Sequence, residues 1–286
     1  MKIGFIGIGV MGEAMASHLL NADYDLYVYN RTKSKANRLV SAGATWCDDV
    51  KSIAQGCDLI FTIIGVPADV ESVYLGEDGL INHAKEKTIL VDMTTSTPDL
   101  AKRIYEAGQA KGLRCLDAPV TGGDVGAKNG TLTVMVGGDK KTYDEILPIL
   151  NLMGKTIVYM GAAGSGQHTK MANQIAIAGA VIGMVEALAY SKGAGLDLET
   201  VLQAVTSGSA ASWQLSNMAP RIINDDFNPG FFIKHFIKDM RIASNESKEM
   251  NVDLPGLDLV LSLYEECQKH DLENCGTQAL YKLYEK

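Results

Sequence analysis

A glycine-rich turn lies seven residues into the chain, directly behind the apolar run of residues 3–6. That run predicts a buried strand, and the stretch 11–22 behind the turn predicts a helix. In such a unit the first glycine makes the tight turn, the second leaves room for a pyrophosphate, and the third packs helix on strand. The helix start also offers N–H groups and a positive dipole end to an anion. Rather than an ordinary glycine turn, we predict a dinucleotide site with contacts from Gly7, Ile8, Gly9, Val10, Met11 and Gly12.

Residues 1–163 alternate short β-rich runs with helical stretches. This pattern is typical of a parallel sheet with helices on both faces. We expect strands at 2–8, 25–29, 58–64, 88–92, 114–116, 132–136 and 156–160. We expect helices at 33–42, 69–74, 98–111 and 140–152, the third with Thr97 as its N-cap. The first domain is therefore predicted to be α/β, a Rossmann-type doubly wound sheet that binds the dinucleotide.

The sequence changes character after the glycine-rich segment 161–166, because no β-rich run follows it. We predict an all-α second domain over residues 164–286, with helices at 167–192, 198–206, 212–223, 235–250, 256–270 and 276–284. The first of these is apolar on every face between residues 175 and 182, which predicts that it is buried all round. Because this helix is longer than its small domain requires, other chains are needed to cover it. We therefore expect a homodimer or homotetramer, with this domain serving substrate binding and oligomerisation.

Composition narrows the classes of function. The chain carries 26 Lys and Arg against 34 Asp and Glu, which argues against a nucleic acid or an acidic membrane as partner. The first strand begins almost at once and the longest apolar stretch contains Gly and Glu, so we expect a soluble, cytoplasmic protein without a signal peptide. The five cysteines form no C-x-x-C pair and the five histidines have no ligand spacing. We therefore expect free thiols and no metal site.

The end of the second predicted strand indicates which dinucleotide is bound. NAD-selective versions of this fold place an acidic residue there to bind the ribose hydroxyls. This chain has Asn30, followed by Arg31 and Thr32, with Lys35 close behind. A guanidinium, a hydroxyl and an ammonium suit a 2′-phosphate. We predict that NADP is preferred and NAD possible. The same residues would also fit Thr32 as a helix N-cap and Arg31 as a solvated turn residue.

A nicotinamide cofactor implies hydride transfer, and a carbonyl that accepts hydride needs a positioned proton donor. Lys170 stands early in an otherwise apolar helix, where an ammonium is costly without a partner or a role. Asn173 and Gln174 lie one turn further on. Spacing alone also fits a lysine whose stem lies along the surface with its ammonium in water.

Four motifs in the same order carry a family resemblance. They are residues 5–12, the run Asp117-Ala118-Pro119-Val120-Thr121-Gly122-Gly123, Gly166 to Lys170 with Asn173, and Ile237-Lys238-Asp239-Met240. Through them the chain resembles the β-hydroxyacid dehydrogenase family over essentially its whole length. That family includes 3-hydroxyisobutyrate dehydrogenase, tartronate semialdehyde reductase and the glyoxylate/succinic semialdehyde reductases.

The resemblance implies roles for the matching positions. Lys170 falls on the family's catalytic lysine, which donates a proton to the carbonyl oxygen and holds the alkoxide as it forms. The substrate-binding positions are Thr121, Gly122 and Gly123, which hold a carboxylate, together with Asn173, Gln174 and Asp239. The further cofactor-binding positions are Ile64 and Gly65 on the adenosine side, Thr95 at the nicotinamide, and Lys238, which reaches cofactor and substrate.

Some positions depart from the family pattern. Thr121 replaces the usual Ser, Ile64-Gly65 stands where many members have Leu-Pro, and Gln174 stands where several have Asn. Trp213 and Phe231-Phe232 either line the substrate pocket or belong to the core.

The predicted function is hydride transfer between NADP(H) and a small carboxylate-bearing semialdehyde or 3-hydroxy acid. The alternatives are an NAD-dependent 3-hydroxyisobutyrate dehydrogenase and a non-catalytic NAD(P)-binding scaffold or sensor. Retention of Lys170 favours an enzyme over the scaffold and over the related imine reductases, which replace that lysine.

Overall fold

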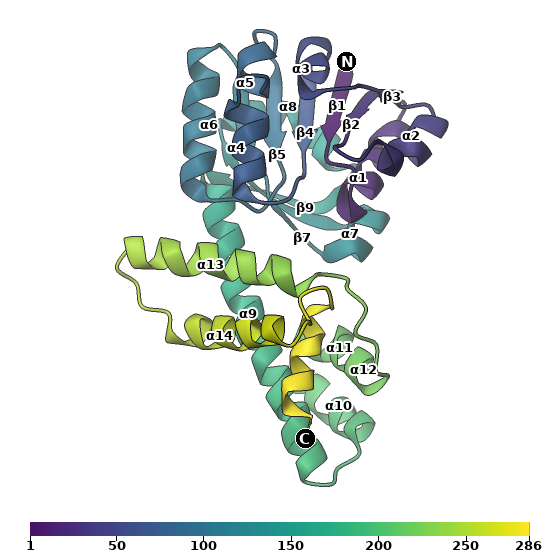
Figure 1. Cartoon of the computed structure of the whole chain (residues 1–286), viewed down its shortest axis with the longest axis vertical. Helices are drawn as coiled ribbons and strands as arrows, with labels where there is room; N and C mark the ends of the chain where they lie inside the picture. The colour runs from purple at the N-terminus through teal and green to yellow at the C-terminus, as the bar shows by residue number, and fades with distance from the viewer. Residues whose placement is uncertain (286) are drawn as a thin grey trace. The chain divides into compact units, whose positions relative to one another are not determined.

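The computed structural model describes residues 1–285, which form two compact units that divide between Lys170 and Met171. The first unit is built on one sheet with the strand order β3-β2-β1-β4-β5-β6-β8-β7, and β9 pairs with β8 (Figure 1). The strands are β1 Lys2–Ile6, β2 Asp25–Tyr29, β3 Thr45–Trp46, β4 Leu59–Thr62, β5 Ile89–Asp92, β6 Arg114–Asp117, β7 Val120–Thr121, β8 Leu132–Gly138 and β9 Gly154–Gly161. The pairs from β3 to β6 are all parallel, whereas β8 runs antiparallel to β6 and β7. The predicted doubly wound α/β fold is confirmed.

Helices cover both faces of this sheet because successive strand residues point to opposite sides. Ile6, Ile60 and Leu90 pack on one face against α3, α4, α5 and α6, of which the last three lie side by side in Figure 1. Phe5, Phe61 and their neighbours pack on the other face against α1, α2, α7 and α8. These elements are α1 Val10–Asn21, η1 Lys33–Ala36, α2 Asn37–Ser41, α3 Val50–Gly56, α4 Pro67–Leu75, α5 Leu80–His83, α6 Pro98–Ala110, α7 Gly123–Asn129 and α8 Lys140–Leu150.

The second unit is helical, as predicted, and its core joins all of its helices. They are α9 Ser165–Gly193, which begins in the first unit, α10 Leu198–Thr206, α11 Trp213–Asn217, α12 Ala219–Ile223, α13 Ile233–Glu249, α14 Pro255–Lys269 and the 3₁₀ segment η2 Thr277–Tyr284. Helices α13 and α14 pack side by side (Figure 1). Two expectations were wrong: the single helix over 212–223 is divided at Met218, just before Pro220, and 276–284 is 3₁₀ rather than α.

The prediction that α9 is buried all round is also wrong for the single chain. Val181, Met184 and Leu188 enter the core of the helical unit, but other positions between residues 171 and 190 of the helix are exposed: Ala172, Ala176, Gly179, Gly183, Glu186, Ala187 and Tyr190. Apart from Glu186 and Tyr190 these residues are small, which leaves much of that face apolar without providing bulk to bury it. By length and hydropathy α9 could span a membrane, with 39% of its most apolar window buried. One such helix is weak evidence of a membrane span, because the core helix of a soluble protein has the same length and composition.

Candidate active site

Four neighbouring parallel strands end in register at one edge of the sheet. Ile6 of β1 is aligned with Thr62 of β4, Thr62 with Asp92 of β5, and Asp92 with Asp117 of β6. The order of the strands reverses between β1 and β4, and open α/β sheets bind ligands at such a switch point, beyond the carboxyl ends of the strands. The predicted cofactor segments that follow β1, β4 and β5 therefore all leave the sheet at this edge.

The glycine turn after β1 has the geometry that a pyrophosphate requires. Gly7 has φ +101, and a Cβ there would lie 2.1 Å from the carbonyl oxygen of Ile63. A Cβ on Gly12 would lie 1.9 Å from the carbonyl oxygen of Gly7, so this glycine lets α1 pack on the turn. Gly9 differs, because a Cβ there would meet nothing within 4 Å. The residues fit a dinucleotide, since open space lies above Gly9 at the start of a 12-residue helix.

The predicted 2′-phosphate positions lie together at the end of β2. The Asn30 side chain accepts a hydrogen bond from the Ile8 backbone N–H at 2.9 Å and donates one to the Thr32 carbonyl at 2.9 Å. Thr32 occupies the N-cap position of η1, yet its hydroxyl makes no capping hydrogen bond. The Arg31 side chain is 90% exposed, and its guanidinium lies 4.0 Å from the Asp69 carboxylate. Lys35 is exposed in η1.

Asp69 accounts for the glycine at position 65. Its carboxylate accepts a hydrogen bond from the Val66 backbone N–H at 3.3 Å at the start of α4, and a Cβ on Gly65 would lie 2.6 Å from the same carboxylate. Ile64 donates its backbone N–H to the Thr94 hydroxyl at 2.9 Å. The segment after β4 is thereby tied to the segment after β5, which carries Thr95 at a half-buried position.

A buried polar chain supports these two segments from below. The Thr62 hydroxyl lies 2.9 Å from the Tyr74 hydroxyl and donates to the Asp92 carboxylate at 2.9 Å. The same carboxylate oxygen accepts the Thr94 backbone N–H at 3.0 Å. Burial, with a smaller contribution from Asp117, raises the pKa of Asp92 to about 6 in spite of these hydrogen bonds.

The predicted carboxylate-binding loop is an exposed turn. Thr121 ends the short strand β7, paired with Thr133 of β8. Gly122 and Gly123 follow with φ of +126° and +64°, backbone conformations that residues other than glycine rarely adopt. Both glycines are exposed, so their backbone amides can be approached by a ligand.

Lys170 closes the first unit and is buried, with 6% of its surface exposed. It lies in the second turn of α9, whose first turn is anchored by Asp117. The Asp117 carboxylate accepts the backbone N–H groups of Gly164 at 2.8 Å and Gln167 at 2.9 Å. Burial raises the pKa of Asp117, although these hydrogen bonds oppose the shift. A buried lysine on an anchored helical turn is a candidate proton donor.

The remaining predicted residues form a hydrogen-bonded chain within the helical unit. The Asn173 amide donates to the Gln174 amide oxygen at 2.7 Å, and Gln174 donates to the Asp239 carboxylate at 2.7 Å. The other oxygen of Asp239 lies 2.9 Å from the Lys238 ammonium. Asp239 is 2% exposed. The structure thus connects α9 with α13 through four residues that were predicted to bind substrate or cofactor.

Trp213, Phe231 and Phe232, which were predicted either to line the pocket or to belong to the core, are not among the buried core residues. Trp213 is 63% exposed and Phe231 36% exposed. Phe231 and Phe232 pack against His235, whose pKa is lowered chiefly by burial.

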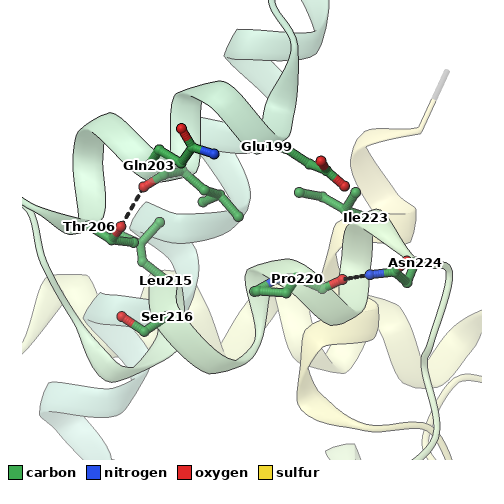
Figure 2. A pocket seen from close by; sticks show the side chains of 9 residues that line it. Glu199, Gln203, Thr206, Leu215, Ser216, Pro220, Ile223 and Asn224 are labelled. Atoms are coloured by element: carbon green, nitrogen blue, oxygen red, sulfur yellow. Dashed lines mark hydrogen bonds between the residues drawn. The ribbon is translucent and has the colours of Figure 1, made fainter.

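A hollow of about 360 Å³ lies among α10, α11 and α12 (Figure 2). Its lining is Glu199, Leu202, Gln203, Thr206, Leu215, Ser216, Pro220, Ile223 and Asn224. The predicted site residues are not among them. Within residues 1–285, His, Cys, Asp and Glu form no group of three or more that could hold a metal ion.

Two sequence families cover almost the whole chain. Residues 2–161 match the NAD binding domain of 6-phosphogluconate dehydrogenase. Residues 164–284 match the NAD-binding domain of NADP-dependent 3-hydroxyisobutyrate dehydrogenase. The chain belongs to the β-hydroxyacid dehydrogenase family. It is accordingly an NAD(P)-dependent oxidoreductase of the hydroxyacid dehydrogenase class.

Individual relatives agree with this assignment. The chain is 54% identical over 284 residues to an uncharacterised oxidoreductase, YkwC, of Bacillus subtilis, covering 99% of both chains. It is 35% identical over 285 residues to 2-hydroxy-3-oxopropionate reductase of Escherichia coli, covering 100% of this chain and 97% of the other. A structure of 3-hydroxyisobutyrate dehydrogenase from Mycobacterium tuberculosis with L-serine superimposes with a TM-score of 0.91 at 25% identity, covering 100% of this chain and 99% of that one.

Several residues without a predicted role are hydrogen-bonded to the ends of these strands or to the segments that follow them. They are Asp69, Tyr74, Asp92, the Asp117 side chain and Gln167. The available signal was polarity within apolar surroundings, since Asp92 and Asp117 each end a buried strand.

Proposed function

We propose that the protein is an NADP-preferring reductase of a small semialdehyde or 2-oxo acid that bears a carboxylate. The reverse reaction would oxidise the corresponding hydroxy acid. The observation that carries the proposal is the buried Lys170 on the α9 turn that Asp117 anchors. A lysine held in a buried position on a fixed helical turn can donate a proton to a bound carbonyl.

Each predicted residue has a chemical task in this reaction. Bound NADPH supplies the hydride that adds to the carbonyl carbon. Lys170 donates a proton to the carbonyl oxygen as the C=O π bond breaks, and takes a proton back from solvent afterwards. The Thr121 hydroxyl and the amides of Gly122 and Gly123 hold the substrate carboxylate. Asn173 and Lys238, ordered by Gln174 and Asp239, contribute the remaining polar contacts.

The choice of NADP rests on the end of β2. Arg31 and Lys35 bring two positive charges to this point, and the Thr32 hydroxyl is not used for capping. The match of residues 164–284 to an NADP-dependent dehydrogenase supports the same cofactor.

The decisive experiment combines a substrate panel with a lysine variant. NADPH or NADH is mixed with the wild-type protein and short carboxylate-bearing carbonyls, and the loss of nicotinamide absorbance is followed. Lys170→Met should lower kcat about 10²–10⁴-fold, because a positioned general acid contributes about that much. NADPH should bind this variant as tightly as the wild type.

Lys192→Met changes an exposed lysine near the end of the same helix and should leave the rate unchanged. Turnover of 3-hydroxyisobutyrate with NAD, and none with NADPH and any semialdehyde, would favour the NAD-dependent dehydrogenase. Cofactor binding without turnover of any carboxylate-bearing carbonyl would contradict an enzyme of this kind.

The exposed small-residue face of α9 supports a homodimer or homotetramer, since a second copy would cover the apolar surface that one chain leaves open. A net charge of −8 supports a soluble enzyme, which we propose to be cytoplasmic.

A further inference from the structure

Gln167 is completely buried and joins two segments that are far apart in the sequence. Its amide nitrogen Nε2 donates to the Thr94 carbonyl oxygen at 2.8 Å. Its amide oxygen Oε1 accepts the Ser96 backbone N–H at 3.0 Å. One carboxamide thus pairs a carbonyl and an N–H on either side of Thr95. Only a planar group with a donor and an acceptor on one carbon can make both bonds together.

The backbone of Gln167 is fixed independently of its side chain. Its N–H donates to Asp117 at the end of β6. The neighbouring Gly166 allows this approach, because a Cβ there would lie 2.4 Å from the Met135 carbonyl and 2.8 Å from the Asp117 carboxylate. Gln167 is therefore held to β6 through its main chain and to the segment after β5 through its side chain.

We infer that Gln167 is a positioning residue, which sets the Thr94–Ser96 turn and the Lys170 turn of α9 at a fixed distance from each other. The inference rests on the proposed function, in which Thr95 lies at the nicotinamide and Lys170 donates the proton. Lys170 follows Gln167 by three residues, a rise of about 4.5 Å along one helix. A change at Gln167 displaces the two turns relative to each other, and a misplacement of about 1 Å can lower a rate about 10²-fold.

Gln167→Glu separates positioning from general stability. The new carboxyl keeps the oxygen that accepts from Ser96, but its second oxygen faces the Thr94 carbonyl and repels it unless it carries a proton. Burial favours the protonated form. Asp117 beside the Gln167 backbone and Asp92 below Thr94 favour it further, whereas Lys170 one turn on opposes it. Acidification therefore restores the missing donor.

The expected result is a kcat lowered about 10–100-fold at pH 8 that recovers toward the wild-type value as the pH falls to 5.5. Rates are expressed as the variant-to-wild-type ratio at each pH, so that titration of Asp92 and Asp117 in both proteins cancels. The dissociation constant of 2′,5′-ADP should stay within about twofold of wild type, because this probe occupies only the adenosine end. Gln203→Glu makes the same chemical change at an exposed position of α10 and should leave the ratio near one at every pH.

Gln167→Met keeps the length of the side chain and removes both hydrogen bonds. It should lose a similar factor in kcat with no recovery on acidification. Hydrogen exchange of the Ser96 amide is measured in the cofactor-free proteins and corrected for intrinsic exchange. Relative to wild type it should be about tenfold faster in Gln167→Met at every pH. In Gln167→Glu it should be faster only at high pH. Equal recovery in both variants, or wild-type kcat at pH 8 in Gln167→Met, would overturn the inference. Failure of both variants to fold would assign Gln167 to stability and also overturn it.

Failure of the proposed function gives a different result. A wild-type protein that reduces no carboxylate-bearing carbonyl contradicts the reaction, while the exchange of Ser96 still reports whether Gln167 holds the turn. Wild-type turnover with unchanged Ser96 exchange in Gln167→Met contradicts the positioning role alone.

Discussion

Burial gives the Asp92 carboxyl a proton affinity far above that of a carboxyl in water. Its pKa of about 6 compares with 3.8 in the unfolded chain. Since the folded protein binds this proton more tightly, the contribution to the free energy of unfolding is fully present below pH 4 and is lost as the pH rises to 6. The difference corresponds to about 3 kcal/mol.

Asp92→Asn should remove this dependence. Asparagine keeps an oxygen to accept from Thr62 and Thr94 but carries no charge, so the variant should be about 1–3 kcal/mol more stable than wild type at pH 8. Urea unfolding at several pH values measures the effect. Asp139→Asn is the control of opposite sign. Hydrogen bonds from Thr142 lower the pKa of Asp139, so its stabilising contribution is lost as the pH falls. If the free energy of unfolding varied with pH in the same way in wild type and Asp92→Asn, the raised pKa of Asp92 would be contradicted.

Arg31 carries the prediction about cofactor choice. Arg31→Ala should weaken binding of 2′,5′-ADP about 10–100-fold and leave 5′-AMP unaffected, because only the former has the 2′-phosphate that a guanidinium binds. Isothermal titration with both nucleotides measures the difference. Arg103→Ala removes an exposed arginine of α6 that pairs with Glu71 of α4 and serves as the control. Equal weakening of both nucleotides would mean that Arg31 does not recognise the phosphate.

Helices and strands that are marked by their own periodicity or cap residues could be predicted from the sequence. The helix over 198–206 and the strand over 25–29 have the predicted bounds, and Thr97 caps α6 by accepting the Leu100 N–H at 3.2 Å. The missed elements β3, β7, α3, α5 and α7 have two to seven residues. Their formation depends on distant partners, as β7 depends on β8.

For the candidate site, the sequence motifs were enough to name the motif residues, whose roles remain predictions. Gln167 could not be assigned a role, because its partners Thr94 and Ser96 lie about seventy residues away.

The turn between β1 and α1 allows packing and ligand binding to be separated. Gly12→Ala should destabilise the protein by about 1–3 kcal/mol, because its methyl overlaps the Gly7 carbonyl. Gly9→Ala meets no neighbour and should change stability by less than about 1 kcal/mol, yet weaken NADPH binding about tenfold by occupying the phosphate space. Urea unfolding and fluorescence titration measure the two effects. A Gly9→Ala protein that binds NADPH normally would argue against a pyrophosphate there.

For the whole molecule, the exposed face of α9 predicts association. Light scattering should give a mass at least twice the 30.7 kDa of one chain. Gly183→Glu should shift it toward one chain, because the change raises helix propensity while placing a buried charge in the interface. Gln203→Glu on α10 is the control. A monomeric wild-type protein would remove the inference from α9 altogether.

Asn30 limits how the proposed NADP preference of this enzyme can be redesigned. The usual route from NADP to NAD is a carboxylate at the end of the second strand. In this protein the Asn30 amide nitrogen donates a hydrogen bond of 2.9 Å to the Thr32 carbonyl. An aspartate at this position would place a carboxylate oxygen against the carbonyl oxygen. A single exchange at residue 30 would therefore distort the loop that it is meant to retune. Redesign should begin at Arg31 and treat residues 30 and 32 as a unit.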